Sequence, residues 1–190
     1  MRGRGGPTGG GKGSRGERRR RKWTPQLGGI HWGPWPLSEY TLAALRAGIA
    51  WVAQEAFLFA ATVAENIALA RPGASRAELE AVARQAAVHD DIERLPQGYD
   101  TPVGERGVTL SGGQRQRVAI ARALLTDVPL LLLADALSAV DTGTEARILA
   151  HLREVRGGRT AMIVSHRLSA VVDAGEIIVL KAGRIVERGT

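Results

Sequence analysis

Residues 111–114, Ser-Gly-Gly-Gln, have the types and spacing of a helix entrance that binds an anion. Ser111 and Gln114 stand at the S-x-x-Q spacing of a capping box, in which each side chain bonds to the other's free backbone N–H, so a helix is predicted to begin here. Apolar residues then recur every three or four positions until Asp127-Val128-Pro129, which predicts the helix end. The two glycines admit a ligand close to the backbone, at the positive end of the helix dipole. The segment therefore predicts an anion site, with phosphate as the natural ligand.

A second glycine-rich segment, residues 6–13, follows the phosphate-loop pattern GxxxxGK but ends in glycine where the pattern has Ser or Thr. A serine comes one position late. The glycines allow successive N–H groups to curl around a phosphate, and the lysine would reach its oxygens. In so glycine-rich a stretch, the match can also be accidental. The candidate phosphate-binding residues are Gly6, Gly9, Gly11, Lys12, Gly13 and Ser14.

Three polar residues follow segments that we predict to be strands of a parallel sheet. In open α/β sheets, ligands gather at the C-terminal ends of the strands, so these residues are candidates for chemistry. The alternative is a loop amide for the glutamine and a structural role for the histidine. The three are Gln54 after residues 49–52, Asp135 after residues 130–133 and His166 after residues 160–164.

The string LSGGQRQRVAIARALL, residues 110–125, closely resembles the signature motif of ABC-type ATPases. From Leu37 to Thr190 the chain resembles the nucleotide-binding domain of an exporter-type ABC transporter, and over residues 6–36 the resemblance is partial. The strings TVAENIALA and TPVGERG are the cues to the exporter branch. The resemblance implies ATP hydrolysis that powers transmembrane export. It also implies the cofactors ATP and Mg²⁺ and a position at the cytoplasmic face of the cell membrane.

The resemblance implies partners as well. In this family the signature residues Ser111, Gly112, Gly113 and Gln114 hold the γ-phosphate of an ATP bound mainly by the other subunit of a head-to-tail dimer. Asp141 stands in the adjoining D-loop. The expected partners are therefore a second nucleotide-binding domain and the transmembrane domains of a transporter. The exposed-looking cluster Phe57-Leu58-Phe59 suits docking to the latter.

For the chain's own ATP site, the resemblance places Gln54 and Ser14 at the Mg²⁺ ion and His166 at the γ-phosphate. The lysine-to-glutamine spacing fits, because Gln54 lies 42 positions after Lys12. Asp135 stands in the place of the catalytic base, where the family has Glu, and Ala134 in the place of a metal-side Asp. An alanine holds no cation, and a carboxylate displaced by about 1 Å can cost about 100-fold in rate. We expect this half-site to be weak.

The predicted fold class is α/β: a mostly parallel sheet of the P-loop NTPase type, flanked by helices, with an α-helical signature subdomain and the N-terminal strands missing. The predicted domains are residues 1–36, a degenerate phosphate-loop region, and residues 37–190, with the helical subdomain at about 57–126. Capping boxes at Thr62/Glu65 and Ser75/Glu78 predict two of its helices. We expect the chain to be a fragment or a damaged copy.

Composition leaves two other functions open. Residues 1–22 hold seven Arg, two Lys and one Glu, so this segment carries +8 and the rest of the chain −1. With Trp23, Trp32 and Trp35 nearby, it could bind nucleic acid by phosphate neutralisation and base stacking, although we consider this partner unlikely. A nucleotide-binding regulator without turnover is the second alternative.

Three further features of the composition bear on class and origin. The chain has no cysteine, which fits a reducing compartment, and no apolar run of 18 residues that would span a bilayer. Four consecutive arginines after the phosphate loop would fit a locally shifted reading frame.

Overall fold

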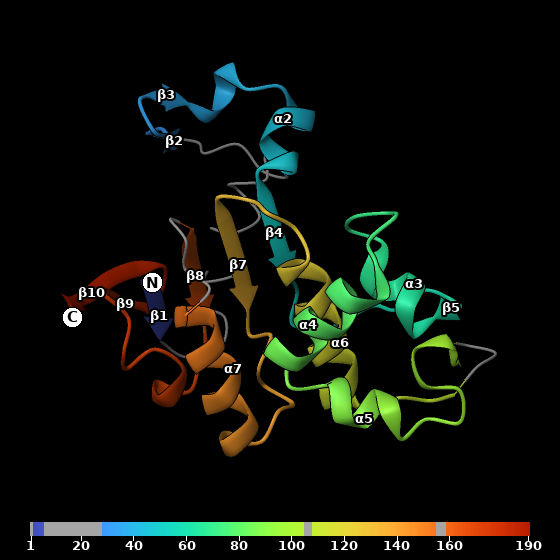
Figure 1. The fold of residues 1–190 in the computed structure, drawn as a ribbon. Helices are drawn as coiled ribbons and strands as arrows, with labels where there is room; N and C mark the ends of the chain where they lie inside the picture. The colour runs from blue at the N-terminus through green and yellow to red at the C-terminus, as the bar shows by residue number, and fades with distance from the viewer. Residues whose placement is uncertain (1, 6–27, 105–107, 155–158) are drawn as a thin grey trace. The chain divides into compact units, whose positions relative to one another are not determined.

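The computed structural model describes residues 2–5, 28–104, 108–154 and 159–190 (Figure 1). The candidate phosphate-loop residues 6–14 and Trp23 lie outside these ranges. The chain divides into two compact units, one of residues 1–51, 128–134 and 159–190, the other of residues 52–127 and 135–158. The predicted division at residue 37 stays a prediction. Among the described residues, no helix has the length and apolar character to cross a membrane.

The first unit is built on a six-stranded sheet with the order β10-β9-β1-β8-β7-β4. Its strand β7 pairs in parallel with β8, and β1 pairs in parallel with both β8 and β9, as the arrows in Figure 1 show. Strand β10 closes the edge antiparallel to β9. The sheet strands are β1 (Arg2–Gly5), β4 (Ile49–Val52), β7 (Leu130–Ala134), β8 (Thr160–Val164), β9 (Glu176–Lys181) and β10 (Arg184–Gly189).

The burial of these strands follows from their composition. Leu130 to Leu133 are all buried, as expected for a strand covered on both faces of a parallel sheet. Strand β10 is exposed throughout, which suits the outer strand of a closing hairpin. The strands predicted at residues 49–52, 130–133 and 160–164 are confirmed, and β9 and β10 form an antiparallel hairpin.

Strand β1 corrects part of the sequence-based expectation. We expected the strands before the phosphate loop to be missing, but Arg2–Gly5 forms one, between β8 and β9. Arg4 pairs with Val164, and Val164 also pairs with Ala134. Strands β1, β7 and β8 therefore end level with one another. Ligands of α/β folds bind at this end of the strands.

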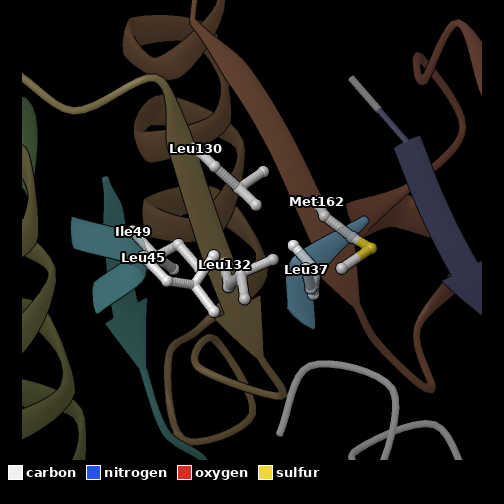
Figure 2. Close-up of a cluster of buried hydrophobic side chains, with 6 residues drawn as sticks. All are labelled: Leu37, Leu45, Ile49, Leu130, Leu132 and Met162. Carbon is white, nitrogen blue, oxygen red and sulfur yellow. The ribbon is translucent and has the colours of Figure 1, made fainter. Parts of the chain in front are cut away.

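A compact apolar cluster includes Ile49 of the predicted strand β4 (Figure 2). Ile30, Trp32, Tyr40 and Trp51 pack against it, and the Tyr40 hydroxyl donates to the Trp32 carbonyl at 3.0 Å. The cluster is Leu37, Leu45, Ile49, Leu130, Leu132 and Met162. Leu37 and Leu45 lie on the short elements η1 (Leu37–Glu39) and α2 (Leu42–Ala47), and Trp32 lies on β2 (His31–Trp32), which pairs with β3 (Trp35–Pro36). The short helix η3 (Leu168–Ala170) follows β8.

The second unit is mainly helical, and α6 lies beside α3 and α4 (Figure 1). Helices α3, α4 and α6 each begin with a capping box, as the sequence predicts. Two strands, β5 and β6, pair antiparallel beside them. The elements are β5 (Ala61–Thr62), α3 (Val63–Ala68), α4 (Arg76–Gln85), α5 (His89–Glu93), η2 (Gly98–Asp100), β6 (Pro102–Val103), α6 (Gly112–Leu124) and α7 (Thr142–Glu154).

The caps of α3 and α4 make stability depend on pH. Bonds from the backbone and hydroxyl of Thr62 hold the pKa of Glu65 below its ordinary value of 4.5, and Ser75 does the same, with the backbone bond again dominant, for the pKa of Glu78. A depressed carboxyl pKa stabilises the fold above 4.5, and this stabilisation is lost as the pH falls through the folded-state pKa.

We therefore expect E65Q/E78Q, which keeps an oxygen at each cap, to be less stable than the parent at pH 6, and this difference to be smaller at pH 4. Urea unfolding of both proteins at the two pH values measures the difference. A gap in unfolding free energy that stays constant with pH would contradict this account of the caps.

Candidate functional site

A capping box fixes the start of α6. The Ser111 hydroxyl accepts from the Gln114 N–H at 3.2 Å, and the Gln114 side-chain oxygen accepts from the Ser111 N–H at 2.9 Å. Ser111 and Gly112 are exposed. The box leaves the N–H groups of Gly112 and Gly113 without an acceptor in the helix, since first-turn donors have none. Two amides and a hydroxyl proton therefore remain for a ligand.

Helix α5 anchors this entrance. Asp91 accepts from the Arg117 guanidinium at 2.7 Å and from the Gln114 amide nitrogen at 3.3 Å. Both ends of the Gln114 amide are thus occupied within the chain. Gln114 therefore fixes the Ser111 backbone. Sequence spacing alone does not tell whether such a glutamine fixes the backbone or contacts a ligand. The sequence analysis missed Asp91, which lies 23 positions from Gln114.

Gly113 lies against the backbone of the loop that follows β7. A Cβ built on Gly113 would stand 2.8 Å from the Ala139 carbonyl oxygen, closer than real Cβ atoms approach. At Gly112 the nearest atom is the Ala139 Cβ at 3.7 Å, an ordinary contact. The second signature glycine is therefore required by this chain's own packing, and the first is not.

Asp141 ends the same loop and begins α7. Its carboxylate accepts from the Thr144 N–H at 2.9 Å, so it acts as the N-cap of the helix. This bond, the largest cause, lowers the pKa of Asp141. The helix that it caps, α7, begins at the next residue, Thr142.

Gln54 is exposed just after β4, where the sequence placed it. Its carbonyl accepts from the side-chain amide of Gln116 at 3.0 Å, across 62 positions. Gln116 sits on α6 and is 4% exposed. The sequence analysis missed it too, because hydrophobic periodicity gives no sign of a buried amide.

Asp135 and His166 follow two neighbouring strands that end level with one another. Asp135 comes directly after Ala134 with φ = 51°, in the left-handed region that Asp tolerates better than most residues. His166 is exposed, two positions after Val164, and the neighbouring Ser165 hydroxyl accepts from the Arg167 N–H at 3.0 Å. The structure thus bears out the predicted strand-end positions of both residues, while their chemical roles stay predictions.

The described residues fit Mg²⁺ only in part. They contain no group of three His, Asp or Glu side chains that could hold a metal ion, and Ala134 offers no oxygen where the family pattern has one. Mg²⁺ commonly takes one or two protein oxygens and completes its shell with phosphates and water. After β4 and β7, Gln54 and Asp135 are the first described residues with a side-chain oxygen.

A scan against known families matches residues 5–138 to the family described as ABC transporter. The chain belongs to the ABC transporter family. The multidrug resistance-like ATP-binding protein MdlA of Escherichia coli K12 is 54% identical over 184 residues, 97% of this chain and 31% of that protein. The ATM1-type heavy metal exporter of Novosphingobium aromaticivorans is 47% identical over 185 residues, 97% of this chain and 30% of the exporter.

A solved structure agrees with these relatives. The chain matches a bacterial Atm1-family ABC exporter with ATP bound at a TM-score of 0.95 and 46% identity, covering 100% of this chain and 33% of that one. This ABC chain therefore spans about a third of the length of the relatives it matches. The predicted family and the P-loop NTPase-type fold class are confirmed.

The two signature glycines give a matched pair of substitutions. We expect G113A to destabilise the chain by about 1–3 kcal/mol, because the new methyl group meets a backbone carbonyl that cannot turn away. G112A should leave stability unchanged or raise it, since Ala favours a helix over Gly by up to about 1 kcal/mol. Urea unfolding of both variants makes the comparison. Equal stability of the two would contradict the packing at Gly113.

Proposed function

We propose that this chain is the ATP-binding part of an exporter-type ABC transporter, and that its signature residues complete the ATP site of a second such chain. The observation that supports this most directly is the exposed start of α6. Two amides lie there at the positive end of a 13-residue helix, beside a hydroxyl whose proton is free to donate. A terminal phosphate is the ligand that this donor set suits.

The roles of the other residues belong to the same proposal. Asp141, at the end of the loop that touches Gly113, would face the partner with the signature. On the chain's own side, Gly6, Gly9, Gly11, Lys12, Gly13 and Ser14 would hold the phosphates. Gln54 and Ser14 would contact Mg²⁺, which supplies charge neutralisation of the phosphates when bound. Asp135 would orient water, and His166 would contact the γ-phosphate.

We propose that the two ATP sites are unequal when this chain pairs with a competent partner chain, and that a pair of two copies of this chain turns over little. Ala134 removes a carboxylate from the chain's own site, and Asp135 is one methylene shorter than the family's Glu. Phosphoryl transfer depends on positioning and charge stabilisation, so both changes act on what the site must supply. The signature side has no such change.

The transmembrane partner would dock on an aromatic pair. Phe57 and Phe59 are 68% and 49% exposed, and their rings meet edge to face at 5.0 Å. Buried Asn66 fixes their loop by accepting from the Phe59 N–H at 2.9 Å and donating to the Phe59 carbonyl at 3.0 Å. The Arg122 guanidinium, whose pKa burial lowers, donates to the carbonyls of Asn66 and Phe57. The pair is thus an exposed apolar patch on a loop that Asn66 and Arg122 hold in place.

Nucleic-acid binding gains no support from the described tryptophans. Trp32 is half-buried against the apolar cluster of the first unit, which leaves Trp35, at 58% exposed, as the described ring free to stack on a base. Residues 1–22 would still provide charge.

The test uses variants of this chain that separate the two half-sites. We expect the parent to bind ATP but to hydrolyse it slowly, and A134D to raise the Mg²⁺-dependent rate by about tenfold or more, since it restores a carboxylate. S111R added to A134D should abolish that rate, because the large cation blocks the phosphate position. Mixing A134D/S111R with the parent should restore it, since the parent contributes its signature.

Ser75→Arg is the matched control, because Ser75 is also the capping serine of a helix but has no role in the proposed site. A134D/S75R should keep the rate of A134D. Fast hydrolysis by the parent alone would contradict the unequal sites. Failure of the mixture to recover would contradict donation of the signature. ATP binding without phosphate release in every mixture would favour the regulator, and salt-sensitive oligonucleotide binding that ignores ATP would favour the nucleic-acid alternative.

A further inference from the structure

One buried side-chain amide, that of Gln116, joins three segments of the second unit. Its nitrogen donates to the Gln54 carbonyl at 3.0 Å and to the Ser138 hydroxyl at 3.1 Å. Its oxygen accepts from the Ala139 N–H at 3.0 Å. The side chain itself comes from the second turn of α6.

The amide is fully used and can lie in only one orientation. A glutamine amide has two N–H donors and one oxygen, and here each donor has a partner and the oxygen has one. Turning it over would set its oxygen against the Gln54 carbonyl and its N–H₂ against the Ala139 N–H. The backbone partners therefore fix the side chain, and the side chain in turn fixes the spacing of the backbones.

The joined segments serve different half-sites in the proposed function. Gln54 belongs to the chain's own ATP site. Ser138 and Ala139 precede Asp141, and the Ala139 carbonyl lies against Gly113, so this loop and the signature face the partner's site. One side chain that would touch no nucleotide thus ties a residue of one site to residues of the other.

We propose that Gln116 is a positioning residue that holds Gln54 of the chain's own site in register with the loop and signature that complete the partner's site. The assignment of the two sites rests on the proposed function. The bonds themselves do not. Turnover in the chain's own site then depends on the bond to Gln54, and turnover in the partner's site depends on the bond to Ala139.

A second tie on the same helix supports this inference. Two turns further on, Arg122 donates to the Phe57 carbonyl at 3.3 Å and to the Asn66 carbonyl at 2.6 Å. Residues 54–57 are therefore fastened to α6 at both ends. If docking displaced the aromatic pair, these bonds would displace α6 as well, and with it the signature at the start of α6.

The first test needs no ATP turnover. Gln116→Met keeps the volume and removes all three bonds, while Gln116→Glu keeps an oxygen for the Ala139 N–H. We expect the Ala139 amide to exchange with solvent about tenfold faster in Q116M than in the parent, because it loses its acceptor, and at close to the parent rate in Q116E. Hydrogen exchange followed by NMR measures both. Q85M, at a half-buried glutamine of α4, is the matched control and should leave the Ala139 exchange unchanged. Unchanged exchange in Q116M would overturn the proposal.

The second test uses the mixed pair described above and holds even if Q116M does not fold. Q116E keeps the Ala139 bond and sets an oxygen against the Gln54 carbonyl. Placed in the A134D/S111R chain, it should lower kcat by about tenfold, because Gln54 there serves the working site. Placed in the parent, which lends only its signature, it should leave kcat and the KM for ATP near their original values at saturating amounts of that chain.

If Gln116 had a merely structural role, Q116E would lower kcat equally in both placements, and that result would overturn the proposal. An unchanged kcat in both placements would also overturn it. If no mixture hydrolyses ATP, the proposed function fails, while the Ala139 exchange in Q116M and Q116E still decides whether Gln116 holds the loop.

Discussion

The signature region depends on one close approach of two backbones, that of Gly113 to the carbonyl of Ala139. This approach is possible only without a side chain on Gly113, and it brings the loop of residues 138–141 against the first turn of α6. The capping box, the Asp91 anchor and the Gln116 amide all act around this contact. Together they hold the exposed donors of α6 still, which a phosphate site requires because donors fixed in advance need no reordering when the charged ligand arrives.

Sequence reasoning succeeded where the signal is local. Capping boxes, the apolar run of β7 and the proline after α6 each depend on a few adjacent residues, so helix starts and strands followed from them. The family followed from the LSGGQ string. Arg2–Gly5 was missed because a four-residue strand of Arg and Gly has no apolar pattern, and it forms through its pairing with β8 and β9.

The contacts that join the site were beyond such reasoning. Gln116 meets Gln54 across 62 positions, Arg122 meets Asn66 across 56, and Arg117 meets Asp91 across 26. In the sequence Gln116, Arg117 and Arg122 are polar residues on one predicted helix, and nothing distinguishes them from solvent-facing ones. Only the tertiary fold shows that they are buried or half-buried, and burial makes their hydrogen bonds obligatory. The proposed asymmetry of the ATP sites has another source. Ala134 and Asp135 stand out only by comparison with the family pattern.

The three capping boxes differ in charge at their third helical position, and this difference decides which helix start can bind an anion. Helices α3 and α4 close their boxes with Glu65 and Glu78, whereas α6 uses Gln114. A carboxylate at that position would neutralise the positive end of the dipole and repel an approaching phosphate. The neutral amide satisfies the same backbone groups without that cost. Glutamine at the third position therefore leaves the positive end of α6 able to bind an anion, while the glutamates of α3 and α4 neutralise theirs.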